Sequence, residues 1–157
     1  MRPVVLKLSV SVVLLWLSTA LAAERPVQSA NPGGISFPTL DGDVQQVELN
    51  EVWRIRGASG REEPSGAVII DYAFERLFVK DTLDTVVGKV RDQRRIERFT
   101  LPGGAPVYIA ADKVIGVMRA IPGQHHQNTR SIIIAREGQQ QVRETRDAIR
   151  DLLQSAR

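Results

Sequence analysis

Two adjacent histidines are the residues of this sequence whose type best suits metal chemistry. His125 and His126 stand together in PGQHHQNTR, and the 157-residue chain has no other histidine. Imidazole nitrogens bind zinc and copper well, but two ligands are too few to close a site. Asp112, Glu137 or a residue of a second copy would have to complete it. The pair therefore predicts an exposed loop, with a metal site at His125 and His126 as the weaker alternative.

A pair of carboxylates, Glu62 and Glu63, has the residue type that glycoside hydrolysis needs. The two glutamates are adjacent in GASGREEPSG, a run of turn-forming residues that does not fix the separation of two side chains. The sequence has no phosphate-binding glycine loop, nucleophile elbow or Ser-His-Asp grouping. It has no cysteine either, which excludes thiol catalysis. We therefore expect a non-enzymatic protein without a cofactor.

The two pairs lie in long polar segments, residues 57–66 and 120–129, that connect strand-like sequences. Loops on a rigid β scaffold are common places for recognition, and these two differ in charge. We expect them to contact an envelope protein partner of unknown identity; the alternative is that both are tolerant connections. The candidate partner-binding residues are Arg61, Glu62, Glu63, His125, His126 and Gln127.

The elements that must position these loops occur twice along the chain. FVKDTLDTVVGKV at 78–90 and QVRETRDAIRDLL at 141–153 agree in chemical class at an offset of 63 residues. Similarity at a fixed period is typical of a repeated architecture. We therefore expect an internal duplication, with a first module at 35–92 and a second at 97–155, packed about a pseudo-twofold axis as a monomer, or else as a homodimer.

Each module is expected to contain short strands followed by one helix. Alternating apolar residues predict strands in VQQVEL, VWRIR and AVIIDY of the first module and in PVYIA, VIGVMR and RSIIIAR of the second. Asp81 with Asp84, and Thr145 in the second module, are expected to cap the helices. Helical spacing predicts two apolar stripes: Leu83, Val86, Val87 and Val90, and then Val142, Ile149, Leu152 and Leu153. The predicted fold class is α+β, mainly β, with two tandem β-rich modules each closed by a short C-terminal helix.

Aromatic residues gather in the first module. Period-two alternation places Trp53 on the inner face of its strand together with Ile55. Tyr72, Phe74 and Phe78 form a cluster, and any of them that points outward would give the first module an apolar contact patch.

The first residues indicate export. Residues 1–22 combine Arg2 and Lys7 with an apolar run and an Ala-Leu-Ala cleavage site, which is typical of a signal peptide. The run is shorter than the about 20 apolar residues needed to span a bilayer, so we expect no stable membrane insertion after cleavage; a retained anchor is the alternative. Residues 23–34 are expected to form a flexible lead. The predicted localisation is periplasmic or secreted.

Net charge argues against a nucleic-acid partner. Removing Arg2 and Lys7 from 21 basic residues leaves 19, against 18 acidic ones. Such a balance gives a solvated surface rather than a basic footprint. The arginine-rich run RDQRRIER at 91–98 is accordingly expected to be a solvated connector between the modules.

The sequence resembles the small FlbD-like (SwrD-like) motility proteins. The resemblance rests on VELNEVWRI and VIIDYAFERLFVKDTLDTVVGKV in the first module, and on VYIAADKVIGV and VRETRDAIRDLL in the second. It implies a β-rich module closed by a helix and a flagellar or swarming role, and it brings no catalytic residues. Together these observations predict an exported interaction or assembly module of the bacterial cell envelope. The alternative is a periplasmic protein that binds a small ligand or metal through the 120–129 loop.

Overall fold

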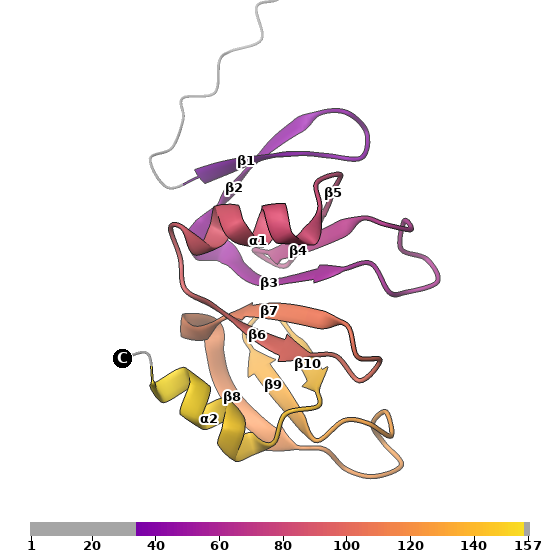
Figure 1. Cartoon of the computed structure of the whole chain (residues 1–157), viewed down its shortest axis with the longest axis vertical. Coiled ribbons are helices and arrows are strands. Elements are labelled where there is room, and N and C mark those ends of the chain that lie inside the picture. The colour runs from indigo at the N-terminus through magenta and orange to yellow at the C-terminus, as the bar shows by residue number, and fades with distance from the viewer. Residues whose placement is uncertain (1–33, 156–157) are drawn as a thin grey trace, which may run out of the picture.

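A computed structural model describes residues 34–155 (Figure 1). The expected signal peptide and all but the last residue of the expected lead lie outside this range. That last residue, Gly34, begins a strand, so it does not belong to a flexible lead.

Ten strands and two α-helices make up the described chain. The first half contains β1 (Gly34–Pro38), β2 (Val44–Glu48), β3 (Val52–Gly57), β4 (Val68–Tyr72), β5 (Glu75–Val79) and α1 (Leu83–Arg91). The second half contains β6 (Ile96–Thr100), β7 (Pro106–Ala110), β8 (Val114–Arg119), β9 (Ser131–Ala135), β10 (Gln139–Val142) and α2 (Arg146–Gln154). A single 3-10 turn, η1 (Leu49–Glu51) or η2 (Ala111–Lys113), precedes the third strand of each half. The α+β, mainly β class is confirmed, and both halves have the same order of elements.

The strands form three antiparallel sheets. β1 pairs with β2, the order of the central sheet is β5-β4-β3-β7-β6, and that of the third is β10-β9-β8. The central sheet therefore joins the two halves through β3 and β7 (Figure 1). If a twofold axis related the two halves, the junction would pair a strand with its own counterpart, or it would contain two equivalent strand pairs. Here the third strand of one half pairs with the second strand of the other, so the expected pseudo-twofold arrangement is wrong and the junction is head-to-tail.

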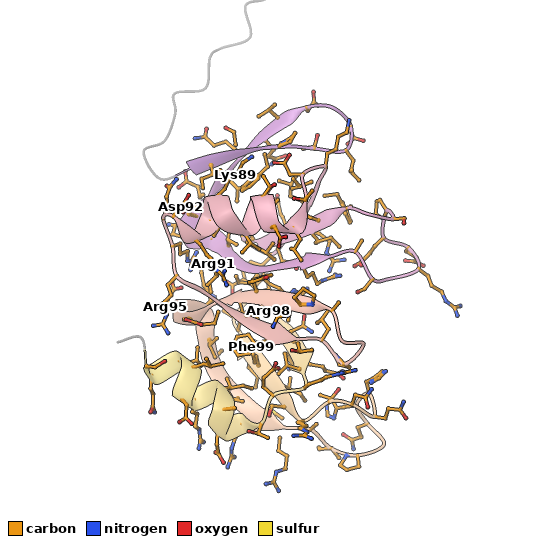
Figure 2. All side chains as sticks on the ribbon, in the orientation of Figure 1. Lys89, Arg91, Asp92, Arg95, Arg98 and Phe99 are labelled. Atoms are coloured by element: carbon orange, nitrogen blue, oxygen red, sulfur yellow. The ribbon has the colours of Figure 1, made fainter. Side chains whose placement is uncertain are left out.

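Strand β7 belongs to two cores at once. Tyr108 and Ala110 pack in the cluster of the first half, and Val107 and Ile109 pack in the cluster of the second half. This division follows from the alternation of side chains between the two faces of a strand. Arg91 extends from the end of α1 toward the second half, where its guanidinium lies 5.1 Å from the Tyr108 ring centroid (Figure 2). The halves are thus joined by a continuous sheet and by side chains on its face.

Threonine caps both helices. The Thr82 hydroxyl accepts from the Thr85 N–H, and the Thr145 hydroxyl accepts from the Ala148 N–H, both at 3.3 Å. Thr145 was expected, whereas Asp81 does not cap α1 and instead pairs with Lys89 at 2.8 Å. The apolar stripe of α1 buries Val86, Val87 and Val90 as expected.

The apolar stripe expected on the second helix is only partly present. Val142 is buried but ends β10 rather than belonging to α2. Ile149 is buried, Leu153 is half-buried and Leu152 is 37% exposed. α2 therefore leaves part of its apolar face uncovered.

Trp53 is buried, as expected, but not on the face that contains Ile55. A register shift between Val52 and Arg54 interrupts the alternation. Trp53 lies outside the core cluster that holds Ile55. A Cβ added to Gly138 in the second half would lie 3.2 Å from its ring. Trp53 therefore packs across the junction instead of into the core of its own half.

Candidate interaction surface

Strand β8 has an unpaired edge. Within residues 34–155 its one strand partner is β9. Ile115 on β8 is 71% exposed and Met118 is 46% exposed; Ile121, which follows the strand, is 46% exposed. An unpaired strand edge can accept a partner strand through its free backbone groups. We call β8 with Ile115 and Met118 the β8 edge.

The other sheet ends are better closed. The end of β1 is joined to β5, since the Lys80 N–H donates to the Pro38 carbonyl at 3.0 Å. The end of β6 is joined to the end of β10 in the same way, since the Arg143 N–H donates to the Thr100 carbonyl at 2.9 Å. Strand β2, in contrast, has only β1 as a strand partner among the residues described. Two strands with open edges therefore remain, β8 and β2.

Two further exposed apolar side chains belong to the first half. Val44 at the start of β2 is 70% exposed, and so is Phe74 in the turn between β4 and β5. Ala73 and Phe74 have positive φ angles of 43° and 67°, a conformation that costs roughly 1 to 2 kcal/mol per residue without glycine. Phe74 points outward, so it is the member of the Tyr72, Phe74 and Phe78 cluster that can form the expected apolar contact patch. Phe74 also lines a cavity with Trp53 and Gly138 at the junction of the halves.

The first candidate loop is tied to the sheet by one of its glutamates. The Glu63 carboxylate accepts hydrogen bonds from both terminal nitrogens of Arg56, at 2.5 and 2.9 Å. It also accepts from the backbone N–H groups of Ser59 and Gly60, both at 2.8 Å. The expectation of Glu63 as a partner-contacting residue does not fit this geometry, because its oxygens are already engaged. Arg61 and Glu62 are exposed and remain available.

Three further charged side chains, Arg76, Asp71 and Arg54, continue this network along the first half. Arg76 bridges the Glu63 and Asp71 carboxylates at 3.4 and 3.1 Å, and Asp71 also accepts from Arg54 at 2.7 Å. Arg54 then crosses the junction to donate to the Gln140 side-chain oxygen at 2.7 Å. The network therefore links the first loop, the central sheet and β10.

The contacts of this network shift the pKa values of Glu63, Arg56 and Arg54. The hydrogen bonds from Arg56, together with those from two backbone N–H groups, hold the pKa of Glu63 well below its usual range. The bond to Glu63 raises the pKa of Arg56. Burial lowers the pKa of Arg54, and the Asp71 carboxylate opposes that effect. The charges are thus satisfied internally, as in a structural ion-pair network rather than a general acid-base pair.

The second candidate loop orders its histidines through backbone contacts. His125 is half-buried, and its Nδ1 lies 3.0 Å from the Ile121 nitrogen. His126 is exposed, and its Nδ1 accepts from the Asn128 N–H at 3.2 Å. Both rings line a cavity of about 280 Å³ beside Ile121 and Thr129. Gln127 is exposed, and it lines both this cavity and a neighbouring depression.

The two loops are not brought together. Both project to the right in Figure 1, with the β6–β7 turn between them. Over residues 34–155, His, Cys, Asp and Glu side chains nowhere gather in a group of three or more that could hold a metal ion. A cavity of about 590 Å³ lies elsewhere, between the connector and the end of α2, and the Arg94–Asp112 ion pair of 2.7 Å lies on its wall. The loops therefore present separate surfaces.

Sequence reasoning missed the β8 edge. Ile115 follows the same alternating pattern as Trp53, and the pattern does not distinguish a buried strand from an open one.

A scan against protein-family models and searches of curated proteins and of solved structures find no match to this chain. In the described part of the chain, neither helix is both long and apolar enough to cross a bilayer.

Proposed function

We propose that this chain is an exported, non-enzymatic interaction or assembly module of the bacterial cell envelope that binds its partner through the β8 edge. The observation that carries the proposal is the combination of an unpaired strand with the exposed side chains of Ile115 and Met118. The FlbD-like resemblance adds a motility-related setting. Residues 1–22 have the composition of an export signal.

Internal duplication is part of the proposal, and local geometry supports it. The β3–β4 pairing shifts register between Val52 and Arg54, and the β8–β9 pairing shifts between Val114 and Gly116, which are the same positions 62 residues on. Both helices begin with a threonine cap. Irregularities repeated at one offset are better explained by copying than by two independent origins.

The β8 edge suits a protein partner better than a small molecule. Its exposed groups lie along an extended strand, where a partner strand would gain main-chain hydrogen bonds along its length. Most exposed strands carry charge or are covered, because an open edge promotes association. The apolar side chains on β8 therefore favour a surface that is covered in use.

Photo-crosslinking in cells tests this assignment against the loops. A photoreactive amino acid would be placed at Met118 on the β8 edge, at Glu62 in the first loop and at Gln127 in the second. All three positions are exposed. The proposal expects a discrete crosslinked product in the envelope fraction from position 118, and weaker products from positions 62 and 127. Products from the loop positions alone would reject the β8 edge as the binding surface.

A second candidate function, small-ligand or metal binding, rests on the cavity lined by His125 and His126. Titration calorimetry with zinc, comparing the parent protein with His126→Ala, tests it. Saturable binding that the substitution abolishes would support this candidate, and equal heats from both proteins would remove it.

A further inference from the structure

The junction between the two halves supplies the geometry of a second contact that the chain leaves open. Within the chain β3 pairs with β7. By position in the order of elements, the counterpart of β3 is β8 and the counterpart of β7 is β2. These two counterparts are the strands with open edges. They lie toward opposite ends of the long axis, so one chain does not join them (Figure 1).

We propose that a second copy of this chain completes the pairing, with β8 of one copy antiparallel to β2 of the next. This inference rests on the proposed function, because the β8 edge is the interaction surface in the proposed function and in the contact between copies. The inference identifies the partner as a second copy of the chain. It commits to a head-to-tail contact, in which two different surfaces meet.

The intrachain junction predicts the register of this contact. β3 and β8 begin at residues 52 and 114, and β2 and β7 begin at 44 and 106, which is an offset of 62 in both cases. Within the chain, Ile55 lies opposite Tyr108 and Arg56 lies opposite Val107. Adding the offset to the β3 residues gives their counterparts on β8, and subtracting it from the β7 residues gives their counterparts on β2. Val117 therefore lies opposite Gln46 of the next copy, and Met118 lies opposite Gln45 of the next copy.

The exposed apolar side chains fit this register. Within the chain, Trp53 packs on Gly138, directly after the β9–β10 turn. The counterpart of Trp53 is Ile115, and the counterpart of the β9–β10 turn is the β4–β5 turn that carries Phe74. Ile115 and Phe74 are 71% and 70% exposed in the single chain. The contact would cover both, which removes apolar surface from water.

The backbone of the β4–β5 turn is a further reason to assign it a role in binding. Two-residue turns with positive φ angles at both positions usually contain Asn-Gly or Asp-Gly, whereas this turn contains Ala73 and Phe74 at 43° and 67°. Strained positions of this kind cluster at functional sites. Here the strained turn presents an exposed aromatic ring.

The contact between copies is expected to be weaker than the junction within one chain. Gln46 occupies the place of Tyr108, which is 7% exposed in the core of the first half. A glutamine contributes less apolar surface than a tyrosine, so the association is reversible. Because the two surfaces differ, repeated contacts give a ring or a filament rather than a closed pair.

Disulfide crosslinking tests the register, and the absence of native cysteine makes every introduced thiol unique. Met118→Cys protein is mixed with Gln45→Cys protein, and in parallel Val117→Cys protein is mixed with Gln46→Cys protein. The mismatched control mixes Met118→Cys with Gln46→Cys, whose side chains would point to opposite faces of the shared sheet. Circular dichroism confirms that each variant is folded.

The inference expects a mixed disulfide from at least one matched pair, at a yield several-fold above that of the mismatched control. Two pairs are used because directly opposite residues alternate between a closer and a wider Cα separation. Equal yields in all three mixtures would overturn the register. Disulfide formation by Met118→Cys protein alone, above its yield in the matched mixture, would indicate symmetric pairing of two β8 strands and would overturn the head-to-tail contact.

Sedimentation measures the same contact without a covalent bond. The parent protein is expected to associate as its concentration rises. Ile115→Lys with Met118→Lys is expected to weaken association roughly tenfold or more, because both side chains belong to the contact. Gln46→Tyr, which copies Tyr108, is expected to strengthen it. A parent protein that remains monomeric at all concentrations, with no response to Gln46→Tyr, would overturn the inference.

The photo-crosslinking and disulfide experiments distinguish the proposed function from the identity of the partner. A photo-crosslink from position 118 to a different protein, without any matched disulfide between copies, would leave the proposed function standing and remove the second copy as the partner. Failure of both experiments would remove both.

Discussion

Arg56 and Glu63 form a two-point ion pair, with Arg56 Nη2 at 2.5 Å from Glu63 Oε1 and Nη1 at 2.9 Å from Glu63 Oε2. The two side chains are about one tenth exposed. Since Glu63 also accepts from two backbone N–H groups of its own loop, this pair fixes the first loop against β3.

Replacing Glu63 by glutamine should destabilise the protein. The change leaves the Arg56 guanidinium, which is 9% exposed, without its anionic partner, and removing one member of a buried pair costs roughly 3 kcal/mol. Chemical denaturation measures the loss. Glu62→Gln is the matched control, because Glu62 is exposed and should change the free energy of unfolding by less than about 0.5 kcal/mol. Equal effects of the two substitutions would contradict the structural role of Glu63.

The same glutamate should contribute to acid sensitivity. Its folded-state pKa lies well below the reference value of 4.5, so folding favours the ionised form. The stabilisation is fully present above that reference value and is lost as the pH falls below it. The difference in free energy of unfolding between the parent and Glu63→Gln should therefore narrow between about pH 6 and about pH 3. A constant difference across that interval would show that the charge of Glu63 does not stabilise the fold.

Trp53 should be important for the cohesion of the two halves. Its ring is 3% exposed and packs on Gly138 across the junction, so Trp53→Ala should cost about 3 kcal/mol or more. Thermal unfolding followed in parallel by hydrogen exchange in both halves is the measurement. The control is Ile115→Ala at the counterpart position, which is exposed and should change monomer stability by less than about 0.5 kcal/mol. If Trp53→Ala behaves like Ile115→Ala, the junction does not depend on this contact.

The threonine caps should contribute similarly to the two helices. Thr82→Ala and Thr145→Ala each remove a hydroxyl that accepts from a backbone N–H, and each should cost about 1 kcal/mol. Serine at the same positions keeps the acceptor and should restore most of the loss. A serine variant as unstable as the alanine variant would mean that the methyl group, rather than the cap, was responsible.

Local patterns in the sequence predicted most elements of the fold. Alternating apolar residues placed the strands VQQVEL, VWRIR and PVYIA, and helical spacing placed α1, because these periods depend only on backbone geometry. The α+β class followed from them. The pattern does not distinguish Asp81 from its neighbour Thr82 as the cap of α1, since both residue types cap helices and the choice depends on where the first turn begins.

The sequence by itself determined which segments form strands and helices and that their order occurs twice. Only the tertiary structure decided how the halves meet: β3 pairs with β7, so the halves are joined head-to-tail and not by a twofold axis. The physical reason is that strand pairing is a long-range choice between several edges of similar composition, which local periodicity does not encode. That choice buries Trp53 and leaves Ile115 exposed, although both occupy the same place in their strands. It also placed Glu63 against Arg56 and made the β8 edge, rather than either loop, the candidate interaction surface.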